Sequence, residues 1–211
     1  METNSCFSQA TPLGIFEGST DVGSCRPPGS AAYDPATQEY TIAGSGADIW
    51  DKKDAFHFLW KKLKGDFILQ LEFDFVGKAK NEGRKVGWMV RNDLTDDSEQ
   101  INGMVHGHGL TALQYRSKKG GTTASLSSSD RAPNFVQLER RGNLYILSTA
   151  KKGEDLVSLE FKDPGFIRDE AFVGIYICSH EDDAKETAII RNVRITIPAA
   201  DASRTAHSSA R

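Results

Sequence analysis

Phe67-Ile-Leu-Gln-Leu-Glu-Phe-Asp-Phe75 is the stretch that decides the fold class. Apolar side chains occupy every second position, and the positions between them hold Ile68, Gln70, Glu72 and Asp74. Successive side chains of a β-strand point to opposite faces of the sheet. This alternation therefore predicts a long strand with one buried face.

The same short-period pattern recurs along the chain and is separated by turn signals such as Lys-Gly-Asp, Asn-Glu-Gly, Arg-Gly-Asn and Lys-Gly-Glu. Further strands are predicted at residues 40–42, 56–60, 86–90, 110–116, 136–139, 144–148, 156–161, 172–178 and 189–197. No stretch keeps the 3.6-residue period of a helix, and no internal repeat is evident. We therefore expect an all-β protein, a two-sheet antiparallel jelly-roll sandwich.

Composition limits the class of protein. A length of 211 residues suits one domain, and 38% hydrophobic residues are too many for global disorder. A net charge of -3, from 26 basic and 29 acidic residues, argues against a nucleic-acid binder that relies on bulk electrostatics. No apolar run approaches the roughly 20 residues of a membrane span. We expect a flexible segment at 1–11, the sandwich at 12–198 with a polar loop at 118–134, and a disordered tail at 199–211.

The three cysteines do not form a metal or redox motif. No C-x-x-C pair is present, and Cys178 lies in an apolar run that predicts burial. Cys6 and Cys25 could form a disulfide in an oxidising compartment. The first nine residues lack the basic and apolar regions of a secretory signal, so none is predicted in this sequence, although one could have been removed.

Four stretches resemble a bacterial family of concanavalin A-like lectin/glucanase domains: Asp48-Ile-Trp-Asp-Lys-Lys-Asp-Ala-Phe-His-Phe-Leu-Trp-Lys-Lys62, Arg84-Lys-Val-Gly-Trp-Met-Val-Arg91, Val105-His-Gly-His-Gly-Leu-Thr-Ala-Leu-Gln-Tyr-Arg116 and Gly174-Ile-Tyr-Ile-Cys-Ser-His180. The resemblance covers about residues 12–198 and departs at His108, where family members usually carry an acid. It implies a concanavalin A-like jelly roll, a carbohydrate context and an extracellular or periplasmic location. Relatives often sit beside TolB-like propellers or hydrolase domains, and no settled activity is implied.

Costly polar side chains in the middle of predicted strands are the main candidate site. Sugars are held by convergent polar groups beside an apolar platform, and Trp50, in a turn-like segment, could stack on a sugar ring. Strand parity predicts that the polar groups share non-core faces, while Trp60 and Trp88 are predicted to be core. The candidate ligand-binding residues are His57, Lys61, Lys85, Arg91, His106, Gln114, Arg116 and Trp50.

Two enzymatic alternatives use the same region. Glu72 and Asp74 resemble the start of the acidic strand of jelly-roll glucanases, but Gly77 and Lys78 stand where the third acid is needed. A polysaccharide lyase or glycoside hydrolase would place His106 and Arg91 at its centre, with the histidine as base.

Metal sites have weaker support. The acidic stretches 92–99 and 181–183 would suit a structural calcium ion, but neither has EF-hand spacing. His106 and His108 have no identifiable third ligand for zinc, so no metal or other cofactor is predicted. The leading hypothesis is a carbohydrate-binding or accessory domain acting on a polysaccharide. The alternatives are the enzymes above, or a purely structural or interaction domain.

Overall fold

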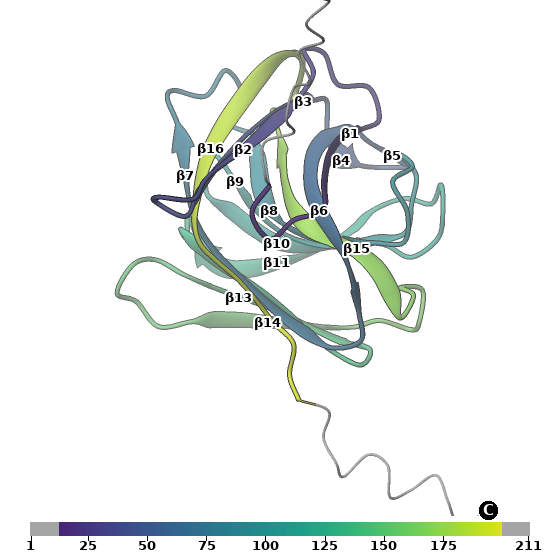
Figure 1. Cartoon of the computed structure of the whole chain (residues 1–211). Coiled ribbons are helices and arrows are strands. Elements are labelled where there is room, and N and C mark those ends of the chain that lie inside the picture. The colour runs from purple at the N-terminus through teal and green to yellow at the C-terminus, as the bar shows by residue number, and fades with distance from the viewer. Residues whose placement is uncertain (1–12, 200–211) are drawn as a thin grey trace, which may run out of the picture.

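The computed structural model describes residues 13–199, which form strands and turns without a helix. Most of them belong to two seven-stranded antiparallel sheets packed face to face (Figure 1). The first sheet has the order β1 (Gly18–Val22), β6 (Phe56–Lys64), β15 (Glu170–Cys178), β8 (Lys85–Arg91), β9 (Gln100–His106), β10 (Leu110–Arg116) and β11 (Ala124–Arg131). The all-β sandwich predicted from the sequence is confirmed.

The second sheet has the order β14 (Val157–Lys162), β13 (Leu144–Ala150), β12 (Phe135–Arg141), β7 (Phe67–Val76), β16 (Glu181–Thr196), β3 (Glu39–Gly46) and β2 (Ser30–Asp34). A separate pair, β4 (Ile49–Trp50) and β5 (Lys53–Asp54), lies outside the first sheet (Figure 1). None of the described residues forms a helix long and apolar enough to cross a membrane.

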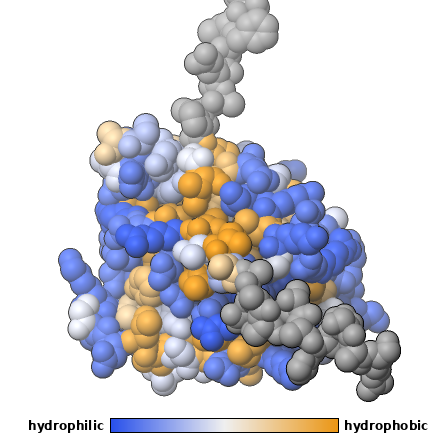
Figure 2. Space-filling view, turned by 60° about the horizontal axis from the view of Figure 1, so that its bottom comes forward, coloured by the Kyte–Doolittle hydropathy of each residue, from blue (hydrophilic) through white to orange (hydrophobic). Residues whose placement is uncertain are grey.

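The main core lies between the two sheets. Along β7, Phe67, Leu69 and Leu71 are fully buried, as the alternating sequence predicts. They pack in one cluster with Trp88 and Ile175 of the first sheet. Burying one such side chain contributes about 1.5–3 kcal/mol, so this cluster is the main source of stability. On the surface, apolar residues also gather in the middle of the face at which β16 ends (Figure 2).

A second apolar cluster lies on the outer face of the first sheet. It contains Phe56, Phe58, Met89 and Tyr176, all without exposed area. Three chain segments cover this face and are joined by backbone hydrogen bonds: Asp54 N–H to Asp96 O, Gly120 N–H to Asp97 O, and Thr123 N–H to Asp51 O. We call these segments, residues 47–55, 92–99 and 117–123, the lid. The central strands β8 and β9 of the first sheet are therefore buried on both faces.

Some sequence expectations need correction. The expected polar loop at 118–134 contains strand β11, whose serines hid its alternation. Strands β1 and β2 precede residue 40, where the first strand was expected. Trp88 is core, whereas Trp60 is half-buried and packs on the outer cluster. The predicted segment 1–11, Cys6 and residues 200–211 of the predicted tail lie outside the described residues.

Candidate functional site

The structure divides the candidate residues between two faces. Lys85, Arg91, His106, Gln114 and Arg116 occupy matching positions on β8, β9 and β10 and point to the outer face of the first sheet. Two other candidates, His57 and Lys61, lie on β6, whose aromatic side chains point to that outer face. His57 and Lys61 consequently point to the opposite side.

An arginine clamp closes one end of the outer face. It consists of Asp54, Arg91 and Arg116, whose side chains have no exposed area. Arg116 donates to both Asp54 carboxylate oxygens, at 2.8 and 2.5 Å, and Arg91 Nη2 lies 3.5 Å from the same carboxylate. Burial pushes both charged types toward neutrality: it raises the pKa of Asp54 and lowers the pKa of Arg91 to about 10.

The remaining donors of the two arginines hold the lid. Arg91 Nε donates to Asp93 O at 2.7 Å, and its Nη2 donates to Thr95 O. Arg116 donates to the carbonyl oxygens of Gly121 and Ser98 at 3.0 and 3.2 Å. These guanidiniums are bonded within the protein and shielded from solvent. We therefore assign Arg91 and Arg116 to lid anchoring rather than to ligand contact.

Buried amides occupy the middle of the outer face. The Tyr176 hydroxyl donates to Asn102 Oδ1 at 2.9 Å, and Asn102 Nδ2 donates to Gln100 Oε1 at 2.7 Å. Gln114, which is 4% exposed, has a buried Oε1 without a hydrogen-bond partner among the described residues, and Gln100 Nε2 is in the same state. A polysaccharide chain cannot reach these groups while the lid is in place.

A histidine cluster lies at the other end of the outer face. The rings of His106 and His108 stack at a centroid distance of 4.8 Å, and His180 lies edge-on to His106 at 6.5 Å. His106 is 9% exposed, while His108 is exposed and His180 is partly exposed. This end is the accessible part of the predicted polar face.

His106 is held as a neutral ring. Its Nδ1 lies 2.8 Å from the Gly83 carbonyl oxygen, which can only accept, so Nδ1 carries the proton and Nε2 is left as an acceptor. Burial, together with the charge of Lys85, lowers the pKa of His106 to about 4. A general base works best with a pKa near the operating pH, so His106 is better suited to accept a hydrogen bond than to abstract a proton.

A second lid carboxylate lies beside this cluster. Lys85, which is 2% exposed, forms an ion pair with Asp48, and His180 Nδ1 is 3.6 Å from the same carboxylate. Trp50 follows two residues later and is 43% exposed. Its carbonyl oxygen accepts from Arg116 at 3.4 Å, so the backbone of Trp50 contacts the clamp.

The structure does not bring His106 and Arg91 into one centre. His106 is opposite Lys85 in the β8–β9 ladder, and Arg91 is opposite Gln100 at the other end of the same ladder. Six residues of extended strand separate the two positions, a distance of about 20 Å. A single catalytic centre built from both side chains is therefore not formed in this structure.

The glucanase-like acids lie elsewhere. Glu72 and Asp74 are on β7 in the second sheet, and Asp74 forms an ion pair with Arg191 at 2.5 Å. They therefore do not line the outer face of the first sheet.

A lysine side chain pairs with the carboxylates of the acidic stretch 92–99 that could have held calcium. Lys119 Nζ lies 3.4 Å from an Asp93 carboxylate oxygen, 3.5 Å from that of Asp97, and 3.0 Å from Thr95 Oγ1. Within residues 13–199, no three His, Cys, Asp or Glu side chains are placed to hold a metal ion.

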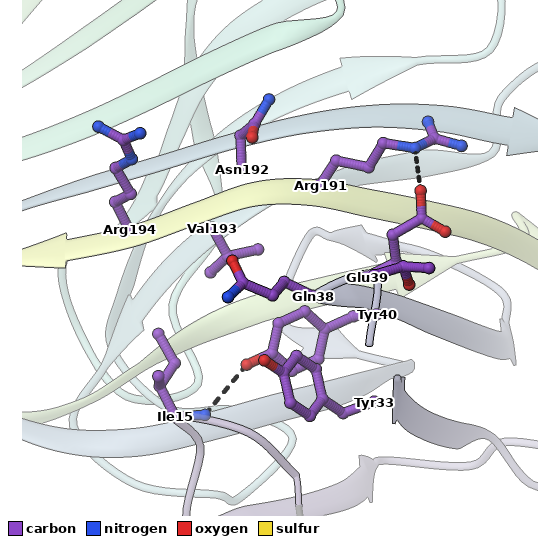
Figure 3. Close-up of a pocket in the computed structure, with 10 residues that line it drawn as sticks. Ile15, Tyr33, Gln38, Glu39, Tyr40, Arg191, Asn192, Val193 and Arg194 are labelled. Atoms are coloured by element: carbon purple, nitrogen blue, oxygen red, sulfur yellow. Dashed lines mark hydrogen bonds and ion pairs between the residues drawn. The ribbon is translucent and has the colours of Figure 1, made fainter. Parts of the chain in front are cut away.

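A separate pocket of about 360 Å³ opens where β3 and β16 diverge (Figure 3). The rings of Tyr33 and Tyr40 lie 4.6 Å apart at its wall, and the Tyr40 hydroxyl accepts from Ile15 N–H. Arg191 is ion-paired with Glu39 at 2.5 Å. Because several of its polar groups already bond within the protein, we do not place the site here.

Sequence reasoning missed the lid carboxylates and Tyr176. Asp54 lies 62 residues before Arg116, and Asp48 lies 37 before Lys85, so no local spacing links them. Tyr176 was hidden in an apolar run. The motif Val105-His-Gly-His-Gly109 was the one local signal that pointed to the accessible end.

Comparisons with known proteins show the fold alone. No family model and no curated protein matches the chain. Among solved structures, a functionally unknown protein from Saccharomyces cerevisiae is 15% identical with a TM-score of 0.64, covering 86% of this chain and 97% of that chain. The marine PL-14 alginate lyase from Aplysia kurodai is 13% identical with a TM-score of 0.53, covering 88% and 93%.

A third neighbour is the GH43 protein BlXynB from Bacillus licheniformis, in a mutant form, at 10% identity and a TM-score of 0.55. It is matched over 76% of this chain but 33% of its own length. Together these structures agree with the all-β sandwich fold of this chain and show nothing beyond the fold. Membership in the bacterial family found beside TolB-like propellers stays a prediction.

Proposed function

We propose that this domain binds a carbohydrate, without cleaving it, at the histidine cluster. The observation that carries the proposal is the contrast in access along one sheet face. The lid seals Arg91, Arg116 and Gln114, while the other end keeps His106 beside exposed His108. The likeness in fold to an alginate lyase and a GH43 protein supports a glycan as the ligand class.

The cluster offers the groups that a sugar needs. A neutral His106 Nε2 accepts from a hydroxyl, Asp48 accepts as well, and the exposed ring of His108 gives a flat surface. A secreted location and an attached propeller or hydrolase domain belong to the same proposal and rest on the sequence resemblance.

Affinity electrophoresis against acidic and neutral polysaccharides tests the proposal, with alginate included because one fold neighbour is an alginate lyase. We expect retardation by at least one glycan, and its loss in His108→Ala and in His106→Gln. Lys118→Ala, at an exposed position of the lid, is the matched control and should be retarded like the parent protein. Silence with every glycan, or retardation that both histidine variants keep, would overturn the proposed site.

The same samples distinguish binding from turnover. New reducing ends together with absorbance from unsaturated products would mean a lyase, and reducing ends alone would mean a hydrolase. Either result would replace the binding proposal with one of the enzymatic alternatives. Retardation without products is the result that we expect.

A further inference from the structure

Three side chains on β1 and β6 form a hydrogen-bonded chain away from the outer face. Ser19 Oγ lies 2.7 Å from His57 Nε2, and His57 Nδ1 lies 2.7 Å from Asp21 Oδ1. Asp21 is directly opposite His57 in the β1–β6 ladder, and Ser19 is two residues earlier on the same face of β1. Hydroxyl, imidazole and carboxylate in this order form the arrangement that activates a serine nucleophile.

The contacts define the proton positions. A carboxylate only accepts, so His57 Nδ1 carries the proton and donates to Asp21. Nε2 then has a free lone pair that accepts from the Ser19 hydroxyl. Burial lowers the pKa of His57, an effect that Lys185 reinforces and Asp21 opposes. The ring is therefore in its basic form at neutral pH.

The base and the carboxylate are held rigidly, while the hydroxyl is accessible. His57 is 3% exposed, and a Cβ at Gly29 would stand 2.2 Å from its Nδ1. At Gly44, a Cβ would stand 2.7 Å from the His57 Cβ, so both glycines are needed for the ring to fit. Gly29 N–H also donates to both oxygens of Asp21 at 3.1 Å. Ser19 is exposed on the edge strand.

We propose that Ser19 is the nucleophile of a second site that cleaves acetyl esters, with His57 as general base and Asp21 as the positioning carboxylate. An exposed edge strand leaves room for a large leaving alcohol but offers little apolar surface to a long acyl chain, which favours acetyl groups. The N–H groups on the free side of β1 are not used by the ladder with β6 and are the donors nearest in sequence for the developing oxyanion.

The reaction conserves atoms and needs no oxidant or reductant. Ser19 Oγ forms a bond to the acyl carbon as its proton passes to His57 Nε2. The bond from that carbon to the alcohol oxygen breaks, and the alcohol leaves with the proton from His57. Water then adds to the acyl-serine, gives its proton to His57, and releases acetic acid as Ser19 recovers its proton.

Labelling with a fluorophosphonate probe, followed by peptide mapping, tests the nucleophile, and p-nitrophenyl acetate hydrolysis tests turnover. We expect one label, on Ser19, and a loss of at least about 100-fold in labelling rate in Ser19→Ala. Ser125→Ala removes an exposed serine from β11, the opposite edge strand of the same sheet, and should label like the parent protein.

Asp21→Asn distinguishes positioning from a structural role. If Asp21 orients His57, labelling of Ser19 should fall by about 100-fold in protein that is still folded. If Asp21 has only a structural role, Asp21→Asn would lower the unfolding temperature and leave the labelling rate of the folded protein unchanged. Labelling that persists in Ser19→Ala, or a Ser19 no more reactive than Ser125, would overturn the proposal.

Discussion

At both ends of the lid, an aspartate forms ion pairs with basic side chains of the same sheet face, but the two ends differ in their access to solvent. At the clamp, Asp54 binds two arginines whose side chains have no exposed area. At the histidine cluster, Asp48 binds one lysine and is itself 32% exposed. An ion pair between a lid carboxylate and the sheet therefore fixes the lid in place where water is excluded. Where water reaches the carboxylate, polar groups beside the pair stay accessible. The cations are buried at both ends, and the exposure of the carboxylate side chain, 0% for Asp54 and 32% for Asp48, is what differs.

Replacing Asp54 with Asn should give the largest effect. The change leaves two buried guanidiniums without a counter-charge, and removing one partner of a buried pair costs about 3–5 kcal/mol. For a domain of this size, that lowers the melting temperature by roughly 6–20 °C. Chemical and thermal unfolding measure the loss.

Asp51→Asn is the matched control, because Asp51 is an exposed acid in the same lid segment and asparagine tolerates its positive φ of 42°. Its free energy of unfolding should change by less than about 0.5 kcal/mol. An Asp54 variant as stable as this control would mean that the clamp does not anchor the lid.

The clamp also shows what the sequence could and could not predict. Along β7, period-two alternation identified the buried face because only one face of that strand is covered. On β6, both faces are covered at one end, so alternation could not show that Phe56 and Phe58 face the lid. Arg91 and Arg116 were singled out from the sequence as costly mid-strand residues and as candidate ligand contacts. Their partner Asp54 could not be predicted, because only the folded chain brings it close.

The serine, histidine and carboxylate arrangement was missed for a related reason. His57 was selected from the sequence as a polar residue within an aromatic strand. Its partners lie on β1, whose sequence Gly-Ser-Thr-Asp-Val carries little apolar alternation and did not predict a strand. Polar edge strands give a weak sequence signal, and functional groups placed on them become visible only in the fold.

Acid should destabilise the protein through the histidine cluster. The pKa of His106 in the folded protein is about 4, below the ordinary 6.5, so the unfolded chain binds its proton more readily. The free energy of unfolding is therefore unaffected by this histidine above pH 6.5. It decreases as the pH falls from 6.5 toward 4, by up to about 3 kcal/mol. Unfolding experiments from pH 7.5 to 4.5 should show this loss, and His106→Gln should show less of it.

The charged and titratable neighbours of His106 are Lys85, His108 and His180. NMR of the histidine rings separates their titrations, with His106→Gln assigning the missing signal. A His106 ring that titrates near pH 6.5 would contradict the neutral acceptor on which the carbohydrate site depends.

Asp48→Asn should give the smallest effect, and it tests the comparison most directly. Lys85 is buried, but the Asp48 carboxylate is partly hydrated and an asparagine oxygen can still accept from Lys85 and from Ile49 N–H, so the expected cost is about 1–2 kcal/mol, less than at the clamp. Removing its negative charge leaves Lys85 less neutralised, which should lower the pKa of His106 further, as ring NMR would show. If Asp48→Asn instead destabilises the protein as much as Asp54→Asn, both ends of the lid are structural locks. The histidine cluster would then be part of a sealed face, and the outer face of the first sheet would have no accessible end at which a glycan could bind.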